Sequence, residues 1–302
     1  MVAKTRLTSE SSGAYAEGAL RWSVEQRLAF IEERLFWLGE VNRGDLIHRF
    51  GVSPSQASKD IARYLEHAPR GLIYDKSAKR YVAGGDFRPV IAAPDAAGFL
   101  GALRLADLGR SREETPLATT VPFDAAPIPE RTVDPYVLRS VLFAIRDRTG
   151  LAVTYQSMSR EEPVRRRICP HALAHDGFRW HTRAFDTESG EFRDFVLGRI
   201  SKPKPDRQLS AQSADDHDWQ TFVDLVIAPH PGLTPGQRRA IALDYGISRG
   251  SIRMRVRRAL LFYALKKLGL DLPENTRPPH QQHIVLVNRS EVLKRPLQQQ
   301  QA

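Results

Sequence analysis

The chain contains a single cysteine, Cys169, so no disulfide can form within it. Such sparing use of cysteine is typical of proteins from a reducing compartment. No apolar run approaches the roughly 20 residues that a membrane-spanning helix needs. The N-terminus also lacks the apolar segment of a signal peptide. Together these absences predict a soluble, cytoplasmic protein.

Signatures of common catalytic sites are missing as well. The chain has no Walker A motif, no GxGxxG loop and no GxSxG nucleophile elbow. Cys169, His171, His175 and His181 do not follow the spacing of a structural zinc site. Cys169 has His171 nearby but no evident third group to orient a thiol nucleophile. We therefore expect no catalytic site, no metal and no cofactor.

What the chain has in excess is positive charge. Lysine and arginine number 45 against 35 aspartate and glutamate, which gives a formal net charge of +10. Hydrophobic residues make up 41% of the chain, enough to bury a core. Its 302 residues suggest two or three domains. The charge excess favours a polyanionic partner such as nucleic acid.

The first 90 residues predict a flexible arm over residues 1–20. Three helices are predicted over 24–39, over 43–50 and from Pro54 onward, and a β-hairpin over 71–82. Gly51 suits the left-handed end of the second helix. Ser53 and Gln56 have the spacing that caps the start of the third helix. Because caps, turn and hairpin agree, residues 21–90 predict a winged helix-turn-helix domain.

In such a domain, short polar side chains of the third helix contact base edges, and cations at its margins and on the wing contact phosphates. The candidate base contacts are Ser55, Gln56 and Ser58. The candidate phosphate contacts are Arg43, Lys59, Arg63, Lys76, Lys79 and Arg80. The alternative is a three-helix interaction module with a solvated, charged surface.

The rest of the chain predicts three further segments. Residues 91–133 predict one helix, over 94–110, and a proline-rich linker. Residues 134–206 predict a helix and then four strands, over 151–157, 166–173, 179–186 and 192–200. Short strands at this regular spacing suggest a small barrel. Residues 207–302 alternate strands and helices, so we expect an α+β multidomain protein.

Residues 178–200 alternate aromatic or branched side chains with arginines around a loop at 186–190. On a strand, Arg179, His181 and Arg183 share one face and Trp180 lies on the other, where we expect it in the core. A row of arginines is useful to a sheet only where solvent or an anion meets it. The open alternatives are a solvated outer face and an anion-binding groove.

Two motifs carry a family resemblance, RWHTRAF at 179–185 and FRDFVLGRI at 192–200. They resemble the WYL-domain transcription regulators, in particular the repressors associated with bacterial anti-phage defence systems of the BREX and CBASS type. The naming tripeptide Trp-Tyr-Leu is Trp180-His181-Thr182 here. Further similar segments are YQSMS at 155–159, PHAL at 170–173, PHPGL at 229–233, DYG at 244–246 and RRALL at 257–261.

The resemblance covers residues 20–290 and implies three domains. They are a winged helix-turn-helix, a WYL domain with an Sm/SH3-like barrel, and a WCX-like C-terminal domain for dimerisation. The implied function is a homodimeric repressor of a phage-defence operon. It would bind an inverted-repeat DNA operator and respond to a nucleotide or oligonucleotide effector at the WYL domain.

The resemblance also implies an effector pocket. Its candidate residues are Tyr155, Ser157, Arg166, His171, His181, Arg183, Arg193 and Arg199, with Arg253 and Arg255 from the C-terminal domain. Asp194 is expected to orient an arginine through a salt bridge rather than to contact the effector. The alternatives are a non-specific nucleic-acid-binding accessory protein and a nucleotide-processing enzyme.

Overall fold

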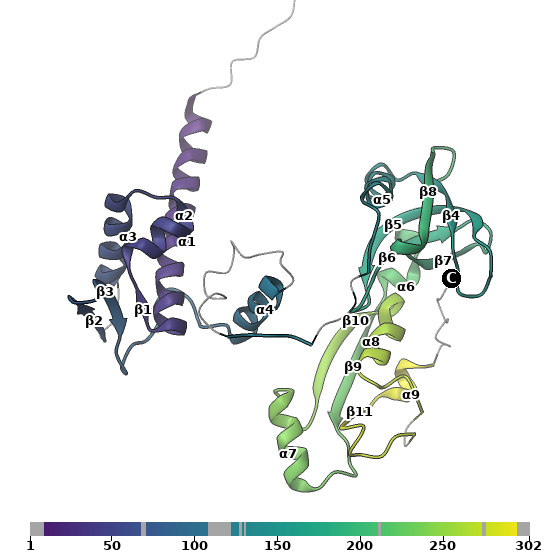
Figure 1. Ribbon diagram of the computed structural model, residues 1–302. Coiled ribbons are helices and arrows are strands. Elements are labelled where there is room, and N and C mark those ends of the chain that lie inside the picture. Colours follow the sequence, from purple (N-terminus) through teal and green to yellow (C-terminus); the bar gives the residue numbers. More distant parts are fainter. Residues whose placement is uncertain are drawn as a thin grey trace, which may run out of the picture. The chain divides into compact units, whose positions relative to one another are not determined.

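The structure is a computed structural model that describes residues 9–67, 71–107, 122–126, 129, 131–210, 213–273 and 276–294. Side chains are described from Ser23 onward, except those of residues 105–107 and of the gaps. The chain divides into two compact units, Met1–Ile128 and Pro129–Ala302 (Figure 1). Within the described ranges, no helix is both long and apolar enough to cross a membrane.

Unit 1 has the order of elements predicted for a winged helix-turn-helix. Its described helices are α1 (Ser9–Leu38), α2 (Arg43–Phe50), α3 (Pro54–His67) and α4 (Ala96–Asp107). The strands β1 (Glu40–Val41), β2 (Leu72–Asp75) and β3 (Arg80–Ala83) pair antiparallel in the order β1-β3-β2. The hairpin of β2 and β3 is the predicted wing.

Local capping fixes the ends of α2 and α3. Asn42 Oδ1 accepts the Asp45 N–H at 3.2 Å, and Asp45 Oδ2 accepts the Asn42 N–H at 2.7 Å. Gly51 ends α2 with a φ of 63°, in the left-handed region. Ser53 Oγ accepts the Gln56 N–H at 3.1 Å, so α3 begins as predicted. These caps depend on side chains within three positions of the helix end, which makes them readable from sequence.

Helix α1 begins earlier than its predicted start at residue 24, because its backbone is helical from Ser9. Three of the seven residues at 14–20 are alanines, the strongest helix former. A serine with capping-box spacing at position 23 therefore does not interrupt the helix. Of the predicted arm, residues 1–8 lie outside the described residues.

The core of unit 1 forms where the inner faces of α1, α2 and α3 meet the small sheet. It consists of Phe30, Ile31, Leu35, Val41, Leu46, Ala57, Ile61, Tyr64 and Phe87. Helix α4 lies against α1, where the rings of Trp37 and Phe99 stack at 4.7 Å between centroids with an interplanar angle of 13°. The proline-rich linker predicted beyond it falls mostly on residues 108–121, outside the described residues.

A buried carboxylate ties the chain after the wing to the helices. Glu32 of α1 is 3% exposed. It accepts the Tyr64 hydroxyl at 3.0 Å and the N–H groups of Val90, Ile91 and Ala92 at 2.6, 2.8 and 2.9 Å. Burial, and then the charge of Glu32, raise the pKa of Tyr64. Consecutive N–H groups that converge on one anion form a nest, and this one fixes the exit of the wing.

Unit 2 begins with α5 (Pro135–Asp147) and a five-stranded antiparallel sheet. The strands are β4 (Gly150–Tyr155), β5 (Val164–His175), β6 (Trp180–Asp186), β7 (Glu191–Val196) and β8 (Ile200–Asp206), in the order β7-β6-β5-β4-β8. Asp134 caps α5 by accepting the Tyr136 N–H at 2.7 Å. Val137, Val141 and Ala144 of α5 then pack into the core of this sheet.

The sheet is open, so the predicted Sm/SH3-like barrel is not found. Among the described strands, β7 pairs only with β6 and β8 only with β4, which leaves two free edges. The predicted strand 192–200 is broken by the single turn η1 (Leu197–Arg199), and β8 is an additional strand. β8 contains Pro203 and Pro205, which have no N–H to donate to a neighbouring strand. They are tolerated because β8 lies at the edge and hydrogen-bonds on one side only.

The C-terminal part of unit 2 is a small α+β domain. The strands β9 (Phe222–Pro229), β10 (Ile252–Arg257) and β11 (Ile284–Leu286) pair antiparallel in the order β10-β9-β11. The described helices are α6 (His217–Gln220), α7 (Pro235–Asp244), α8 (Leu261–Lys267) and α9 (Arg289–Val292). A capping box formed by Thr234 and Gln237 begins α7. Leu225, Ile227, Leu261, Leu265 and Ile284 form the centre of the core.

Glu32→Gln is expected to lower the free energy of unfolding of unit 1 by about 2–4 kcal/mol, because an amide replaces a buried anion that serves four donors. Urea unfolding of the full chain, followed by circular dichroism, measures the change. The neighbouring Glu33→Gln is the matched control. Glu33 is exposed, so its loss should stay within about 0.5 kcal/mol. Equal effects of the two substitutions would contradict the anchoring role of Glu32.

Candidate functional site

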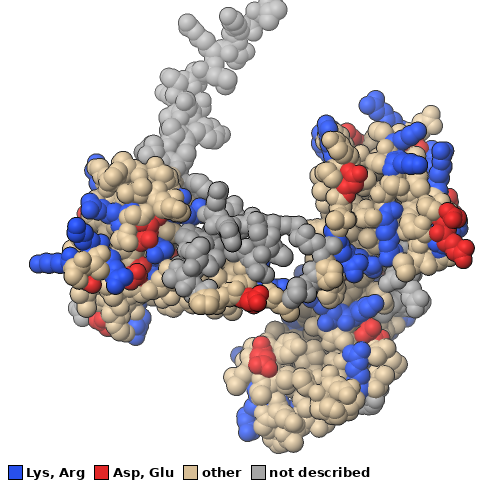
Figure 2. Space-filling view, viewed as in Figure 1, with Lys and Arg blue, Asp and Glu red and all other residues tan. Residues whose placement is uncertain are grey.

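The outer face of α3 carries polar and cationic side chains. The helix buries Ala57 and Ile61 and exposes Ser55, Lys59 and Arg63. Figure 2 shows Lys and Arg side chains along the edge of unit 1 where α3, β2 and β3 lie in Figure 1. This face therefore presents a short polar side chain on the first turn and cations further along, as a DNA-contacting helix requires.

Other predicted DNA contacts are partly engaged within the protein. Gln56 Nε2 donates to Asp60 Oδ1 at 2.9 Å. Ser58 Oγ donates to a backbone carbonyl of the first turn at 3.0 Å, and Arg43 Nη1 donates to Ser58 Oγ at 3.5 Å. Gln56 and Ser58 are half-buried, whereas Ser55 is exposed. Of the three predicted base contacts, Ser55 is thus the most accessible.

The tip of the wing is held by a carboxylate and presents two lysines. Asp75 Oδ1 accepts two backbone N–H groups of the tip at 2.9 and 3.0 Å. Lys76 and Lys79 are exposed at this tip. The third predicted wing cation, Arg80, pairs with Glu40 of β1 at 2.5 Å. Arg80 therefore fastens the wing to β1, while the two lysines point into solvent.

A buried ion pair that the sequence reading missed orients α3 on α1. Arg27 Nε lies 2.6 Å from Asp60 Oδ2, and Arg27 Nη2 lies 3.3 Å from Asp60 Oδ1. The two residues are 8% and 2% exposed. A signal was present in the sequence: position 60 falls on the apolar stripe of 57, 61 and 64, where a charge needs a partner.

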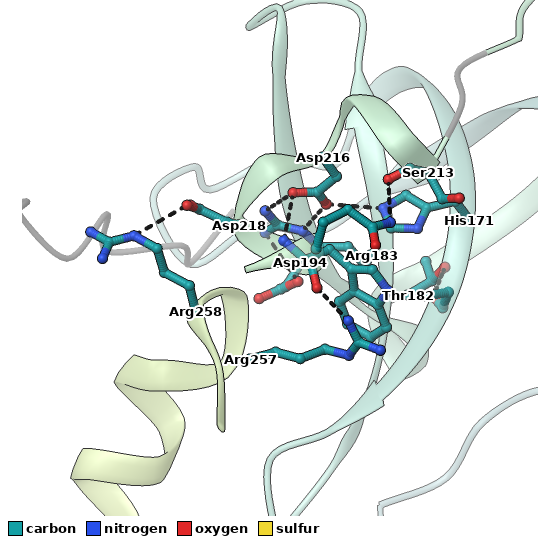
Figure 3. A network of polar contacts seen from close by, with 12 residues as sticks. His171, Thr182, Arg183, Asp194, Ser213, Asp216, Asp218, Arg257 and Arg258 are labelled. Carbon is teal, nitrogen blue, oxygen red and sulfur yellow. Dashed lines mark hydrogen bonds and ion pairs between the residues drawn. The ribbon is translucent and has the colours of Figure 1, made fainter. Parts of the chain in front are cut away.

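In unit 2 the centre of the predicted anion site is a buried arginine (Figure 3). Arg183 of β6 is 1% exposed. Its Nε and Nη2 donate to the two oxygens of Asp216 at 2.7 and 3.0 Å, and Nη1 lies 3.4 Å from Asp194 Oδ1. His171 Nε2 lies 3.0 Å from Asp216 Oδ2, and the Tyr263 hydroxyl donates to Asp194 Oδ2 at 3.0 Å. These five residues, the Arg183 network, join β5, β6 and β7 to α6 and α8.

The Arg183 network keeps its central ion pair charged. Burial opposes a charged guanidinium, but the hydrogen bonds from Arg183 to Asp216 and the charge of Asp194 raise the pKa of Arg183 above its usual value. Burial likewise opposes the Asp216 anion, but hydrogen bonds from His171 and Arg183 lower its pKa. Asp216 also caps α6 by accepting the Trp219 N–H at 3.1 Å. Both sides of the Arg183 guanidinium therefore have a carboxylate partner within the protein.

His181 lies beside this network and holds a second carboxylate. It is 1% exposed and its ring lies 5.1 Å from the ring of Tyr263. His181 Nε2 is 3.0 Å from Asp176 Oδ2. Burial lowers the pKa of His181. Although burial opposes ionisation of Asp176, hydrogen bonds from His181 and from the N–H groups of Phe178 and Arg179 lower its pKa to about 2.

The predicted pocket residues Tyr155, Ser157 and Arg199 lie at a corner of the sheet. Tyr155 is 0% exposed, and its hydroxyl accepts the Val196 N–H at 3.2 Å and a hydrogen bond from Arg199. Ser157 is 6% exposed and lies 3.1 Å from the hydroxyl of Ser159. The hydrogen-bond partners of these side chains therefore lie within the same sheet and its loops.

Two further predicted arginines pair with carboxylates at the β6–β7 end of the sheet. Arg166 Nη1 lies 3.2 Å from Asp186 Oδ2 and also contacts Glu188. Arg193 Nη2 lies 3.2 Å from Glu191 Oε2. Both arginines have acidic partners and are not turned towards the Arg183 network.

Arg253 and Arg255 lie on β10 in the C-terminal domain, where both are exposed. The guanidinium of Arg255 stacks over the Phe222 ring at 4.6 Å. The structure therefore brings His171, His181 and Arg183 together and distributes the other predicted effector residues over separate places. Asp194 orients an arginine as expected, but its partner is Arg183, opposite it on β6, and not the adjacent Arg193.

The predicted core position of Trp180 is wrong, because its side chain is 49% exposed. Trp180 is the first residue of β6, and its ring lies against His175 at 4.8 Å. Residues 181–184 are all buried, so both faces of this central strand are covered. Alternation along the strand therefore does not separate core from surface.

The chemistry of Cys169 and its neighbours differs from that of a metal or thiol site. Across the ranges that the structure describes, no group of three or more His, Cys, Asp or Glu side chains is placed to hold a metal ion. Cys169 is buried, and burial raises the pKa of its thiol, which disfavours the nucleophilic thiolate.

Comparison with known proteins covers nearly the whole chain. Residues 23–105 match the winged helix-turn-helix domain of the BrxR transcriptional regulator, 136–205 match the WYL domain, and 222–292 match the BrxR C-terminal dimerization domain. The DNA-binding transcriptional repressor CapW of Stenotrophomonas maltophilia is 37% identical over 287 residues, 94% of each chain. CapW of Pseudomonas aeruginosa is 36% identical over 293 residues, 97% of this chain and 98% of that one. The chain belongs to the BrxR and CapW family of transcriptional regulators.

A likeness to a solved structure adds no further information. Proteasome accessory factor B/C of Arthrobacter aurescens aligns with 83% of this chain and 46% of that chain, at 19% identity and a TM-score of 0.26. This score is too low to bear on the arrangement of a BrxR and CapW family chain.

The three matched domains are regulator domains and the relatives are named repressors, so the chain is a regulator and not an enzyme.

Within this BrxR and CapW family chain, the Arg183 network lies at a domain boundary. Arg183 and Asp194 belong to the segment that matches the WYL domain, and Tyr263 belongs to the C-terminal dimerization domain. Asp216 lies between the two matched segments. The network therefore fastens the WYL domain to the dimerization domain.

Arg183→Met is expected to lower the free energy of unfolding of unit 2 by about 3–5 kcal/mol, because it leaves two buried carboxylates without their cation. Arg193→Met is the control at the sheet margin, where loss of a half-exposed pair should cost less than about 1 kcal/mol. Urea unfolding of both variants tests this. A loss at Arg183 no larger than at Arg193 would show that the ion pair is not an anchor.

Asp176 should make the stability of unit 2 depend on pH in the acid range. Its pKa falls from an ordinary 3.8 to about 2 on folding. A carboxylate whose pKa is lowered on folding stabilises the folded state at pH values above its unfolded pKa. This contribution is lost as the pH falls from about 4 to about 2. Asp176→Asn should therefore unfold at a lower temperature at pH 7 and converge with the parent chain at pH 2. A constant difference between the two from pH 7 to pH 2 would contradict this assignment.

Proposed function

We propose that this chain is a homodimeric repressor that binds an inverted-repeat DNA operator and is modulated by a nucleotide or oligonucleotide effector bound in unit 2. The observation that carries the proposal is the outer face of α3. Ser55, Lys59 and Arg63 are exposed there, and in the wing that follows Lys76 and Lys79 are exposed as well.

This face has the chemistry needed to read a duplex. Ser55 lies on the first turn of α3, where a hydroxyl is able both to donate to and to accept from a base edge. Lys59 and Arg63 lie one and two turns further on, at positions suited to phosphates. The buried Arg27–Asp60 pair holds α3 on α1, and Glu32 holds the segment that follows the wing on α1. The recognition helix and the wing therefore meet DNA as one rigid body.

Dimerisation follows from the match of residues 222–292 to a dimerization domain. A two-fold dimer presents two α3 helices to two half-sites related by the same symmetry. We therefore propose a pseudo-palindromic operator with half-site centres about 34–36 Å apart, or a multiple of that distance. A chromosomal operator implies a cytoplasmic location.

The proposal also concerns which genes are regulated and which residues bind the effector. The resemblance to defence-associated repressors supports an anti-phage defence operon as the target. Seven of the ten predicted effector residues remain candidates, because the side chains of Arg183, His171 and His181 are paired with carboxylates within the protein. We assign these three to holding the WYL domain in place. An effector shifts the repressor between states only if it binds one state more tightly.

Footprinting on the DNA upstream of the chain's own gene tests the proposed function. The expected result is a protected inverted repeat that survives an excess of random duplex. Equal competition by random duplex or by single strands would instead indicate a non-specific nucleic-acid-binding protein.

Lys59→Ala and Ser55→Ala should separate phosphate from base contacts. Lys59→Ala is expected to weaken binding on all sequences and to reduce the salt slope by about one unit. Ser55→Ala is expected to relax specificity at one base pair and to leave the slope unchanged. Binding curves on the operator and on single-base variants at several salt concentrations measure both effects. Identical behaviour of the two variants would refute this division.

A further inference from the structure

A cavity of about 410 Å³ lies where three segments of unit 2 meet. One wall is Arg131, at the start of the unit. A second wall is the loop of residues 176–179 that precedes β6, and a third is α8 of the C-terminal domain. None of the ten effector residues predicted from sequence lines this cavity. Its volume is within the range of small-molecule binding sites.

The cavity has an excess of positive charge. Arg131, Arg179, Lys266 and Lys267 line it, against the single carboxylate of Asp176. That carboxylate is already bound by His181 and Arg179 at 3.0 and 3.1 Å. Among the described residues, neither lysine has an acidic partner within 4 Å. In Figure 2, Lys and Arg side chains form a band across unit 2 near the level of β6 and α8 in Figure 1.

The cavity also has aromatic walls. Phe178 is 57% exposed, although a phenylalanine on a loop gains nothing from contact with water. Phe262 is half-buried, and Lys266 Nζ lies 5.8 Å from its ring centroid. Tyr263 closes the inner side. Aromatic faces next to cations are the combination that holds a base by stacking and its phosphate by charge.

The walls are built to stay close together. Gly177 has a φ of 100°, a conformation that favours glycine, and a Cβ there would lie 3.0 Å from Nζ of Lys267, so the loop packs closely against this lysine of α8. Asp176 Oδ1 accepts the N–H groups of Phe178 and Arg179, both at 2.8 Å, which fixes the turn that presents them. The buried His181 in turn holds Asp176. These contacts hold the loop wall of the cavity beside α8.

We infer that this cavity binds the phosphate and base of a nucleotide, either free or at the 5′ end of a single strand. Lys266, Lys267 and Arg131 receive the phosphate, and Phe178 and Phe262 receive the base. This inference rests on the proposed function in one respect, namely that the bound nucleotide is the effector of the repressor.

One wall of the cavity belongs to the segment that directly precedes the WYL domain in the sequence. Arg131 belongs to the segment that leads from unit 1, and the next carbonyl, that of Thr132, would lie 2.7 Å from a Cβ at Gly198. The end of this segment is thus packed on the WYL domain. Tyr263 connects the opposite wall to the Arg183 network. A ligand that contacts all three walls favours the arrangement in which they are together, which is what a regulatory ligand must do.

Titration calorimetry on the full chain tests the site with three probes: adenosine monophosphate, a 5′-phosphorylated tetrathymidylate, and inorganic phosphate. At least one nucleotide probe should bind at one site per chain. Lys266→Gln/Lys267→Gln should weaken that binding by roughly tenfold to a hundredfold, because two charge-assisted contacts are lost. Lys202→Gln/Lys204→Gln removes the same charge from exposed positions on β8 and should stay within about twofold of the parent.

The inference is overturned if neither nucleotide probe binds the parent chain, or if the two double variants bind equally. Which nucleotide probe binds more tightly identifies the source of the ligand as a free nucleotide or a strand end. Phe262→Leu tests the stacking contact separately. It should weaken the nucleotide by about tenfold and leave inorganic phosphate within twofold, because phosphate has no base. Equal loss for both probes would overturn the base-binding role of the aromatic wall.

Operator binding of the same proteins separates this inference from the proposed function. The double variant Lys266→Gln/Lys267→Gln should bind the operator as the parent does but no longer respond to the nucleotide. An unchanged response in this variant would overturn the site and leave the repressor intact. A parent chain that binds the nucleotide but no operator would overturn the repressor and leave the site intact.

Discussion

The second half of this protein depends on one buried ion pair. Arg183 places a bidentate fork on Asp216 and its remaining nitrogen on Asp194. Because both carboxylates are only 1% exposed, removal of the guanidinium would leave them buried without their cation, which is a far larger penalty than the loss of one hydrogen bond. The same arginine therefore fixes the WYL sheet, the cap of α6 and, through Tyr263, helix α8. The cavity beside α8 has a defined shape because these elements are held in register.

The winged-helix unit uses the same physical device. Its DNA-facing helix carries polar and cationic side chains outward, where they add little to stability. What orients it is the Arg27–Asp60 pair on its inner side, together with Glu32, which gathers Tyr64 and three consecutive N–H groups. In both units a buried charge with a full set of partners positions a surface whose own residues remain free for a ligand.

Much of the fold was predictable, and the reason is the range of the interactions involved. Asn42 and Asp45, Ser53 and Gln56, and Thr234 and Gln237 cap helices through contacts three residues apart, so the helix starts could be read directly. The exposed Ser55, Lys59 and Arg63 also follow from the helical period of α3. Strand β8 was missed because Pro203 and Pro205 argue against any strand except an edge strand, and edge position is a property of the sheet. Trp180 was misplaced because β6 is covered on both faces.

The sequence by itself determined most of the elements, the capped DNA-facing helix and, through its motifs, the family. The tertiary structure decided which charges are free. Arg183 and Asp216 are 33 residues apart, as are Arg27 and Asp60, and no local pattern reveals that a carboxylate so distant will fill a guanidinium fork. Only the packed chain shows that Arg183 on β6 is turned inward, whereas Arg131, Lys266 and Lys267 meet at an open cavity. Local periodicity is set by neighbouring residues, but the partner of a charge is set by the whole fold.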